Sequence, residues 1–137
     1  MINDDAALLL SVMAYEGCTA EQLEAMLIAV SIVRIMVRYE NIDVETQHIM
    51  KCAEILYDIS EPETIEQILV NGNFVPSYQD MITRLLTNKN SQQLEATLLR
   101  EARMLAEYIA GITEENIEIE FESECARYIW ECLIKDS

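Results

Sequence analysis

Hydrophobic and polar positions follow helical spacing over most of the chain. The most apolar stretch runs from Leu23 to Val37 and holds only three polar residues, Glu24, Ser31 and Arg34. Thr19 followed by Gln22 forms a capping box, which marks a helix start. We therefore predict a helix over residues 20–39, central in the fold and buried on all sides because apolar residues surround it. A buried strand is the alternative that its β-branched residues allow, but the capping box and the length favour helix.

Further capping residues divide the remaining chain into short helices. The predicted N-caps are Asn3, Asp43, Ser60, Ser77, Ser91 and Thr113. The predicted ends of the helices before the last one lie near Glu16, Ile59, Gly72, Thr87 and Gly111. With 3 Gly and 2 Pro, the chain has few of the residues that turns of β-rich folds use. We predict an all-α fold, a compact bundle of six or seven helices forming one domain over residues 1–137.

Residues 117–122 fit two structures. Isoleucine, phenylalanine and glutamate alternate here with a period of two, which is typical of a half-buried strand. The same segment also continues a helical stripe made by Ile117, Phe121, Cys125, Tyr128 and Cys132. We favour the helix, because a lone strand would need a partner. A short extended segment that pairs across a dimer is the alternative.

Charge restricts the classes of partner. The chain has 25 acidic and 9 basic residues, a net charge of −16, and yet 51% of its residues are hydrophobic. A disordered acidic tail would have too few apolar residues to form a core, whereas this chain has enough. Nucleic acid is not expected as a direct ligand, because its phosphates would be repelled. A protein with a basic surface is the partner that this charge favours.

Acidic residues without nearby basic ones gather in two stretches. The first lies between Lys51 and Arg84 and contains Glu54, Asp58, Glu61, Glu63, Glu66 and Asp80. The second contains Glu114, Glu115, Glu118, Glu120, Glu122 and Glu124. On a helix, carboxylates one turn apart are ~5–6 Å from each other, close to the spacing of nucleic-acid phosphates. We predict partner contacts at Glu61, Glu63, Glu66 and the second stretch; the alternative is an acidic face that only keeps the protein in solution.

Trp130 is a further candidate for partner contact. It falls off the stripe of Phe121, Cys125 and Cys132, so it lies either at the edge of the core or in a protein interface.

Few residues point to catalysis or metal binding. Glu45 and His48 have the Glu-x-x-His spacing of di-iron helical bundles, but those sites need a second such motif and this chain has 1 His. His48 and Cys52 could supply two ligands of a zinc site, which needs four. We therefore expect no metal, no cofactor and no enzymatic activity. An enzyme built around Glu45, His48 and Cys52 is the weakest interpretation.

The cysteines and the N-terminal sequence predict a location. Cys18, Cys52, Cys125 and Cys132 are scattered, and we interpret them as buried thiols of a reducing cytoplasm. The start of the chain lacks the basic residues of a secretory signal. The longest apolar run falls short of the ~20 residues that a membrane span needs. We expect a cytoplasmic protein without a membrane partner.

These observations favour a non-enzymatic inhibitor or adaptor that occupies the basic, nucleic-acid-binding surface of a partner protein. A phage or mobile-element protein that blocks a nucleic-acid-targeting defence complex would fit this size and charge. The alternative is an intracellular helical chaperone or immunity protein that masks a client through hydrophobic contacts. The high apolar content is also compatible with a homodimer.

Overall fold

The structure is a computed structural model that describes residues 19–59, 61–112 and 120–135. This part of the chain contains helices and no strand, which confirms the all-α prediction. Its helices are α2 (Ala20–Tyr39), α3 (Val44–Ile55), α4 (Pro62–Asn71), α5 (Pro76–Thr87), α6 (Leu94–Ile109) and α7 (Glu124–Lys135). The predicted helix before Gly17 and the predicted cap Thr113 lie outside the described residues.

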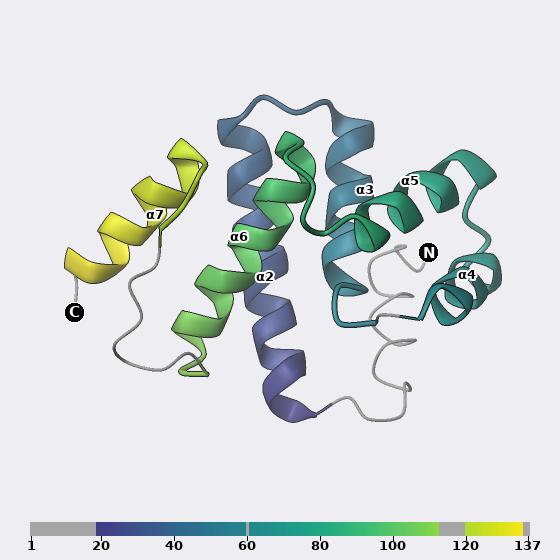
Figure 1. The fold of residues 1–137 in the computed structure, drawn as a ribbon, viewed down its shortest axis with the longest axis horizontal. Helices are drawn as coiled ribbons and strands as arrows, with labels where there is room; N and C mark the ends of the chain where they lie inside the picture. The colour runs from purple at the N-terminus through teal and green to yellow at the C-terminus, as the bar shows by residue number, and fades with distance from the viewer. Residues whose placement is uncertain (1–18, 60, 113–119, 136–137) are drawn as a thin grey trace.

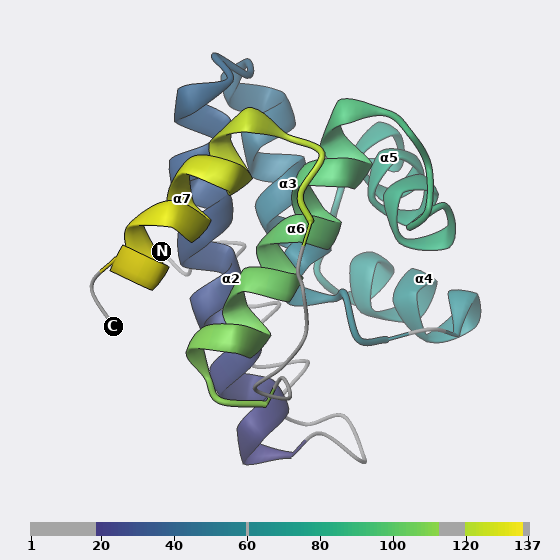
Figure 2. The ribbon, with the colours of Figure 1, turned by 60° about the vertical axis from the view of Figure 1, so that its left-hand side comes forward.

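Three helices form the centre of the molecule. Helix α2 packs against α6 and α3, and α6 also contacts α3. Helix α7 lies against α6 at one end of the long axis, whereas α5 packs on α3 and α4 packs on α5 at the other end (Figures 1 and 2). The buried core joins residues from all six helices, and its largest enclosed side chains include Met36, Ile49, Met50, Leu56, Leu98 and Leu105. The central place predicted for residues 20–39 is confirmed.

The capping box at the start of α2 is present in full. The Thr19 hydroxyl accepts a hydrogen bond from the Gln22 N–H at 3.1 Å, and the Gln22 side chain accepts one from the Thr19 N–H at 2.9 Å. The prediction that α2 is buried on all sides is wrong, because its neighbours cover only part of its circumference. Leu27 and Ile35 remain 47% and 58% exposed.

Helices α2, α4 and α6 end in the same way. Each is followed by one residue in the left-handed conformation, namely Asn41, Asn73 and Gly111. The next N–H returns to a carbonyl five residues earlier, in the pairs Ile42–Val37, Phe74–Leu69 and Ile112–Glu107. This is the pattern of a Schellman ending. Gly72 itself is not left-handed, but a Cβ there would lie 3.0 Å from the Phe74 ring, so this glycine leaves room for a buried aromatic side chain.

Prolines displace two of the predicted helix starts. Helix α5 begins at Pro76 with Val75 as its N-cap, two residues before the predicted cap Ser77, which lies inside the helix. Helix α4 begins at Pro62 with Glu61 as its N-cap, and the predicted cap Ser60 lies outside the described residues. Proline suits the first helical position because its φ is already helical and its missing N–H would have no partner there.

The start of α6 and the end of α3 also differ from the predictions. Helix α6 begins at Leu94 after the N-cap Gln93, because the Ser91 hydroxyl accepts the Gln93 N–H in the preceding loop instead of capping the helix. Helix α3 has Asp43 as its N-cap, as predicted, but ends at Ile55 rather than near Ile59.

The segment before α7 is not helical. Residues 120–123 are neither helix nor strand, so the helical prediction is wrong for the described part of 117–122, and Ile117 to Ile119 lie outside the described residues. The buried Glu101 carboxylate on α6 accepts the backbone N–H groups of Glu122 and Ser123. The Ser123 hydroxyl then accepts the Ala126 N–H at 3.3 Å. The Glu101 carboxylate thus holds residues 122 and 123 outside a helix, and the Ser123 hydroxyl caps α7, which starts at Glu124.

Two further expectations concern thiols and membranes. Cys52 and Cys125 are buried, and burial raises the pKa of the Cys125 thiol. Cys132 is exposed, so the expectation of buried thiols is wrong there, and Cys18 lies outside the described residues. None of the helices in the described ranges combines the length and the apolar character needed to cross a membrane.

Candidate functional site

Helix α4 presents carboxylates on the side away from the core. Ile65 and Leu69 are buried, whereas Glu63, Glu66 and Val70 lie on the opposite, exposed side of the helix. Glu61 is also exposed and occupies the N-cap position, where its side chain makes no capping hydrogen bond. We call Glu61, Glu63 and Glu66 the α4 acidic face. Glu63 and Glu66 are three residues apart and so share one side of the helix, whereas Glu61 precedes the helix as its N-cap.

The α4 acidic face has no cationic partner within the described residues. The ion pairs among the described residues involve Arg84, Arg100 and Arg103, and none of them includes a residue of α4 or Glu61. Within the described ranges, a side-chain hydrogen bond at this face runs from the Thr64 hydroxyl to the Glu61 carboxylate at 3.3 Å. Its charge is therefore not neutralised by neighbouring cations.

The second acidic stretch is only partly described. Glu114, Glu115 and Glu118 lie outside the described residues, while Glu120, Glu122 and Glu124 are exposed. The Glu122 carboxylate lies 3.7 Å from Arg100, and the Glu124 carboxylate beside Tyr39 raises the pKa of that phenol. A helix carrying Glu122 in a row with Glu114 and Glu118 is excluded, because Glu122 precedes α7. Two of these three described carboxylates thus contact residues of their own chain.

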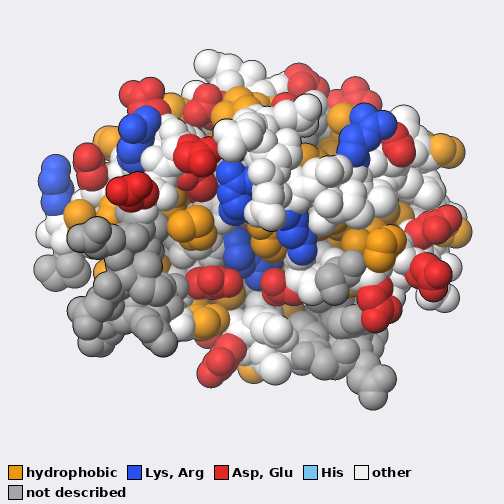
Figure 3. Space-filling model, viewed as in Figure 1, with side chains coloured by type: hydrophobic (Ala, Val, Ile, Leu, Met, Phe, Trp, Pro, Cys, Tyr) orange, Lys and Arg blue, Asp and Glu red, His pale blue; other side chains and the backbone are white. Residues whose placement is uncertain are grey.

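The two acidic groups are not brought together. The α4 acidic face belongs to the end of the molecule formed by α4 and α5, whereas Glu120, Glu122 and Glu124 lie at the end formed by α7 (Figure 1). Figure 3 shows acidic side chains distributed over the visible face, with some basic side chains near its middle and others at its left and upper right. A partner could therefore cover either acidic group without touching the other.

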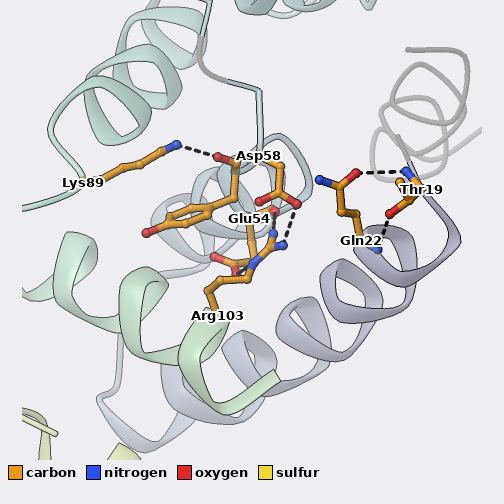
Figure 4. Close-up of polar contacts among 7 residues, drawn as sticks. Thr19, Gln22, Glu54, Asp58, Lys89 and Arg103 are labelled. Atoms are coloured by element: carbon orange, nitrogen blue, oxygen red, sulfur yellow. Dashed lines mark hydrogen bonds and ion pairs between the residues drawn. The ribbon is translucent and has the colours of Figure 1, made fainter. Parts of the chain in front are cut away.

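Several basic residues are held by contacts with other described residues of the protein. Arg103 is 5% exposed and donates to Asp58 at 2.8 Å and to Glu54 at 3.4 Å (Figure 4). Lys89 donates to the Tyr57 carbonyl at 2.6 Å and lies over that ring. Arg100 donates to the Lys89 and Ser91 carbonyls, and Arg84 pairs with Asp80.

Glu54 is not a surface residue. The sequence groups it with the acidic residues between Lys51 and Arg84, but its side chain is fully buried on α3. Burial raises its pKa to about 8, against the lowering effect of Arg103. Its Oε2 atom has no hydrogen-bond partner among the described residues. No sequence signal indicated this burial, because residues two apart do not share a side of a helix and Glu54 is two positions from both Cys52 and Leu56.

The residues considered for catalysis do not form a metal cluster. The described residues contain no group of three or more His, Cys, Asp or Glu side chains that could hold a metal ion. The His48 Nε2 atom lies 3.8 Å from the Cys52 Sγ atom, and the His48 ring lies beside Tyr78. Cys52 is fully buried, whereas Glu45 is exposed. The predicted constellation is therefore divided between the surface and the core.

Trp130 lies at the edge of the core, which is one of its two predicted positions. Its ring meets Tyr108 edge-on at 4.6 Å between centroids and also lies 5.8 Å from Phe121. It is half-buried between α6 and α7.

A surface groove that the sequence did not indicate lies between α3, α5 and the start of α6. It has a volume of about 690 Å³. Its apolar lining includes Ile49, Met81, Leu85 and Leu94, and its polar lining includes Arg84 and Asn88. Met81 and Leu94 are 40% and 42% exposed. The residues come from three separate helices, so only the tertiary structure could reveal the groove.

Comparison with known proteins adds no relative: no family model matches the chain, and no similar curated protein or solved structure was found.

Proposed function

We propose that the protein is a non-enzymatic acidic binding protein, an inhibitor or adaptor that occupies a basic surface of a partner protein. The observation that supports this most is the α4 acidic face. Its carboxylates are exposed and have no cationic partner among the described residues, and α4 packs only at the margin of the bundle. Such a face can approach a flat or grooved partner without rearrangement of the core.

The partner is characterised by its charge. A surface that binds nucleic-acid phosphates carries lysine and arginine, and a strongly acidic protein is steered towards such a surface. Arg84, Lys89, Arg100 and Arg103 are engaged within their own chain, so they do little to offset this attraction. The C-terminal carboxylates Glu120, Glu122 and Glu124 would then serve as a second, separate contact or only add to the overall field.

The test compares two matched pairs of substitutions. Glu63→Gln with Glu66→Gln removes two charges from the α4 acidic face, and Glu120→Gln with Glu131→Gln removes two exposed charges from the other end of the molecule. Tagged protein is used to capture partners from host lysate at low and at high salt, and circular dichroism checks each fold. We expect a basic partner that salt releases, and we expect only the α4 pair of substitutions to reduce its capture.

Other results would contradict the proposal in distinct ways. Equal loss with both pairs would mean attraction to net charge without a defined face. Loss with the Glu120 and Glu131 pair alone would move the contact to the C-terminal end. Capture that neither pair nor salt affects would exclude an acidic contact.

The groove between α3, α5 and α6 supports the second candidate function, a chaperone or immunity protein that masks an apolar client. Its exposed side chains Met81 and Leu94 come from different helices and line one hollow. A client bound there would remain attached at high salt, and Met81→Asp would release it. Capture that is stable to salt and lost with Met81→Asp would favour this function over the acidic contact.

A further inference from the structure

One side of α2 is left uncovered by the other described helices. Exposed residues recur along it at steps of three and four, and they are Glu24, Leu27, Ser31, Arg34, Ile35 and Arg38. We call these residues the outer α2 face. The packed side of the same helix carries Ala25, Ala29, Val33 and Met36 and lies against its neighbours, with α6 in front of α2 in the view of Figure 1.

The outer α2 face has an apolar middle. Leu27 and Ile35 are two turns apart and are 47% and 58% exposed, with Ser31 between them. Large apolar side chains that are aligned on one helix and open to water mark an interaction surface more often than scattered ones do. This face is therefore suited to an apolar contact of about two helical turns.

The two ends of this face carry opposite charges. Glu24 lies on its N-terminal side, and Arg34 and Arg38 lie on its C-terminal side. The α2 sequence is thus complementary to itself when it is read in the opposite direction. In an antiparallel pair with Ser31 at the centre, Leu27 lies opposite Ile35 and Glu24 lies opposite Arg38. A parallel pair would instead place Glu24 against Glu24 and Arg38 against Arg38.

We infer that the outer α2 face binds a second copy of this chain, with the two α2 helices antiparallel across a twofold axis near Ser31. The contact is isologous, because each copy contributes the same residues. Antiparallel helices also place the positive end of one helix dipole beside the negative end of the other. The inference is independent of the proposed function, which uses α4 at another part of the molecule.

The decisive test is a charge exchange measured by sedimentation equilibrium at fixed ionic strength. Glu24→Arg places like charges opposite Arg38, and Arg38→Glu places like charges opposite Glu24. Each change should raise the dimer Kd by about tenfold or more. The double variant Glu24→Arg/Arg38→Glu should restore the Kd to near the original value. Positions 24 and 38 are about 21 Å apart along one helix, so no pair within one copy can produce this rescue.

Apolar substitutions supply a second readout and a control. Ile35→Asp should weaken the dimer while leaving the monomer's free energy of unfolding unchanged, because the Ile35 side chain points away from the core. Val44→Asp alters another exposed apolar residue, 81% exposed and outside α2, and should leave the Kd unchanged. A protein that remains monomeric to about 1 mM would overturn the inference. Failure of the double variant to restore binding, or an unaffected Kd in Ile35→Asp, would overturn it as well.

Discussion

Arg103 on α6 and Glu54 on α3 form a buried ion pair of 3.4 Å, although 49 residues separate them in the chain. Arg103 also donates to the Glu54 carbonyl and to the partly exposed Asp58 carboxylate. One guanidinium thus ties the C-terminal half of α3 to the middle of α6. The pair connects two of the three central helices, and its energetic role can be measured.

Removing one member of this pair should cost more than removing both. Arg103→Met removes the cation beside the buried Glu54 carboxyl, whose pKa is already about 8, and should destabilise the fold by about 1–3 kcal/mol at pH 8 through the lost hydrogen bonds. The double variant Arg103→Met/Glu54→Leu should recover most of this loss, because two apolar side chains need no compensation. Urea unfolding followed by circular dichroism gives the free energies.

The exposed pair Arg84–Asp80 provides the control for this cycle. Its side chains are 71% and 68% exposed, so Arg84→Met should change stability by less than about 1 kcal/mol. Strictly additive effects of the two buried substitutions would mean that Arg103 and Glu54 are not coupled.

The stability of the protein should fall as pH rises from about 5 to about 8. Burial raises the folded-state pKa of Glu54 to about 8 from an ordinary value of 4.5. Between these values the folded state binds the proton more often than the unfolded state, so stability decreases with rising pH. The contribution is complete below the unfolded pKa and is lost as pH passes the folded pKa. Unfolding of wild type and Glu54→Gln across this range isolates the effect, and identical pH profiles for the two proteins would contradict it.

Loss of the Glu101 carboxylate should loosen α7 more than the rest of the fold. Glu101 accepts the backbone N–H groups of Glu122 and Ser123, and the carboxamide of Glu101→Gln has one acceptor oxygen instead of two. We expect a cost of about 1–3 kcal/mol. Amide hydrogen exchange should show faster exchange in α7 than in α2, whereas the control Glu107→Gln on the same helix should change neither. Uniform acceleration in both helices would mean that Glu101 acts on global stability alone.

The contact between Tyr108 and Trp130 should report on the docking of α7. Tyr108→Leu removes an edge-on ring contact of 4.6 Å, which should cost about 0.5–1.5 kcal/mol beyond the lost burial. The chain has 1 Trp, so its fluorescence observes this site directly, and the emission should shift on substitution. The control Tyr128→Leu changes a tyrosine on α7, the helix of Trp130. Tyr128 is 63% exposed, so this change should leave the emission unaltered. An unchanged spectrum in Tyr108→Leu would show that the rings do not interact.

The sequence by itself determined the helical class and many of the helix boundaries, because those signals are local. The Thr19–Gln22 capping box, the Asp43 cap and the stop at Gly111 each depend on residues within one turn. The predicted helix starts at Ser77 and Ser91 were wrong, because a proline in one case and a loop hydrogen bond in the other competed with the serine cap. For the candidate site, the shared exposed side of Glu63 and Glu66 followed from their spacing on one helix, whereas Glu61 lies before the helix as its N-cap.

Only the tertiary structure decided which charged residues are inside. Glu54, Glu101 and Arg103 are buried beside polar partners from distant helices and loops, and sequence spacing does not identify such partners. The same limit applies to α2, whose apolar residues encircle the helix while neighbours cover only one side. Hydrophobic periodicity tells which side chains can be buried, but the number and placement of packing helices determine which of them are.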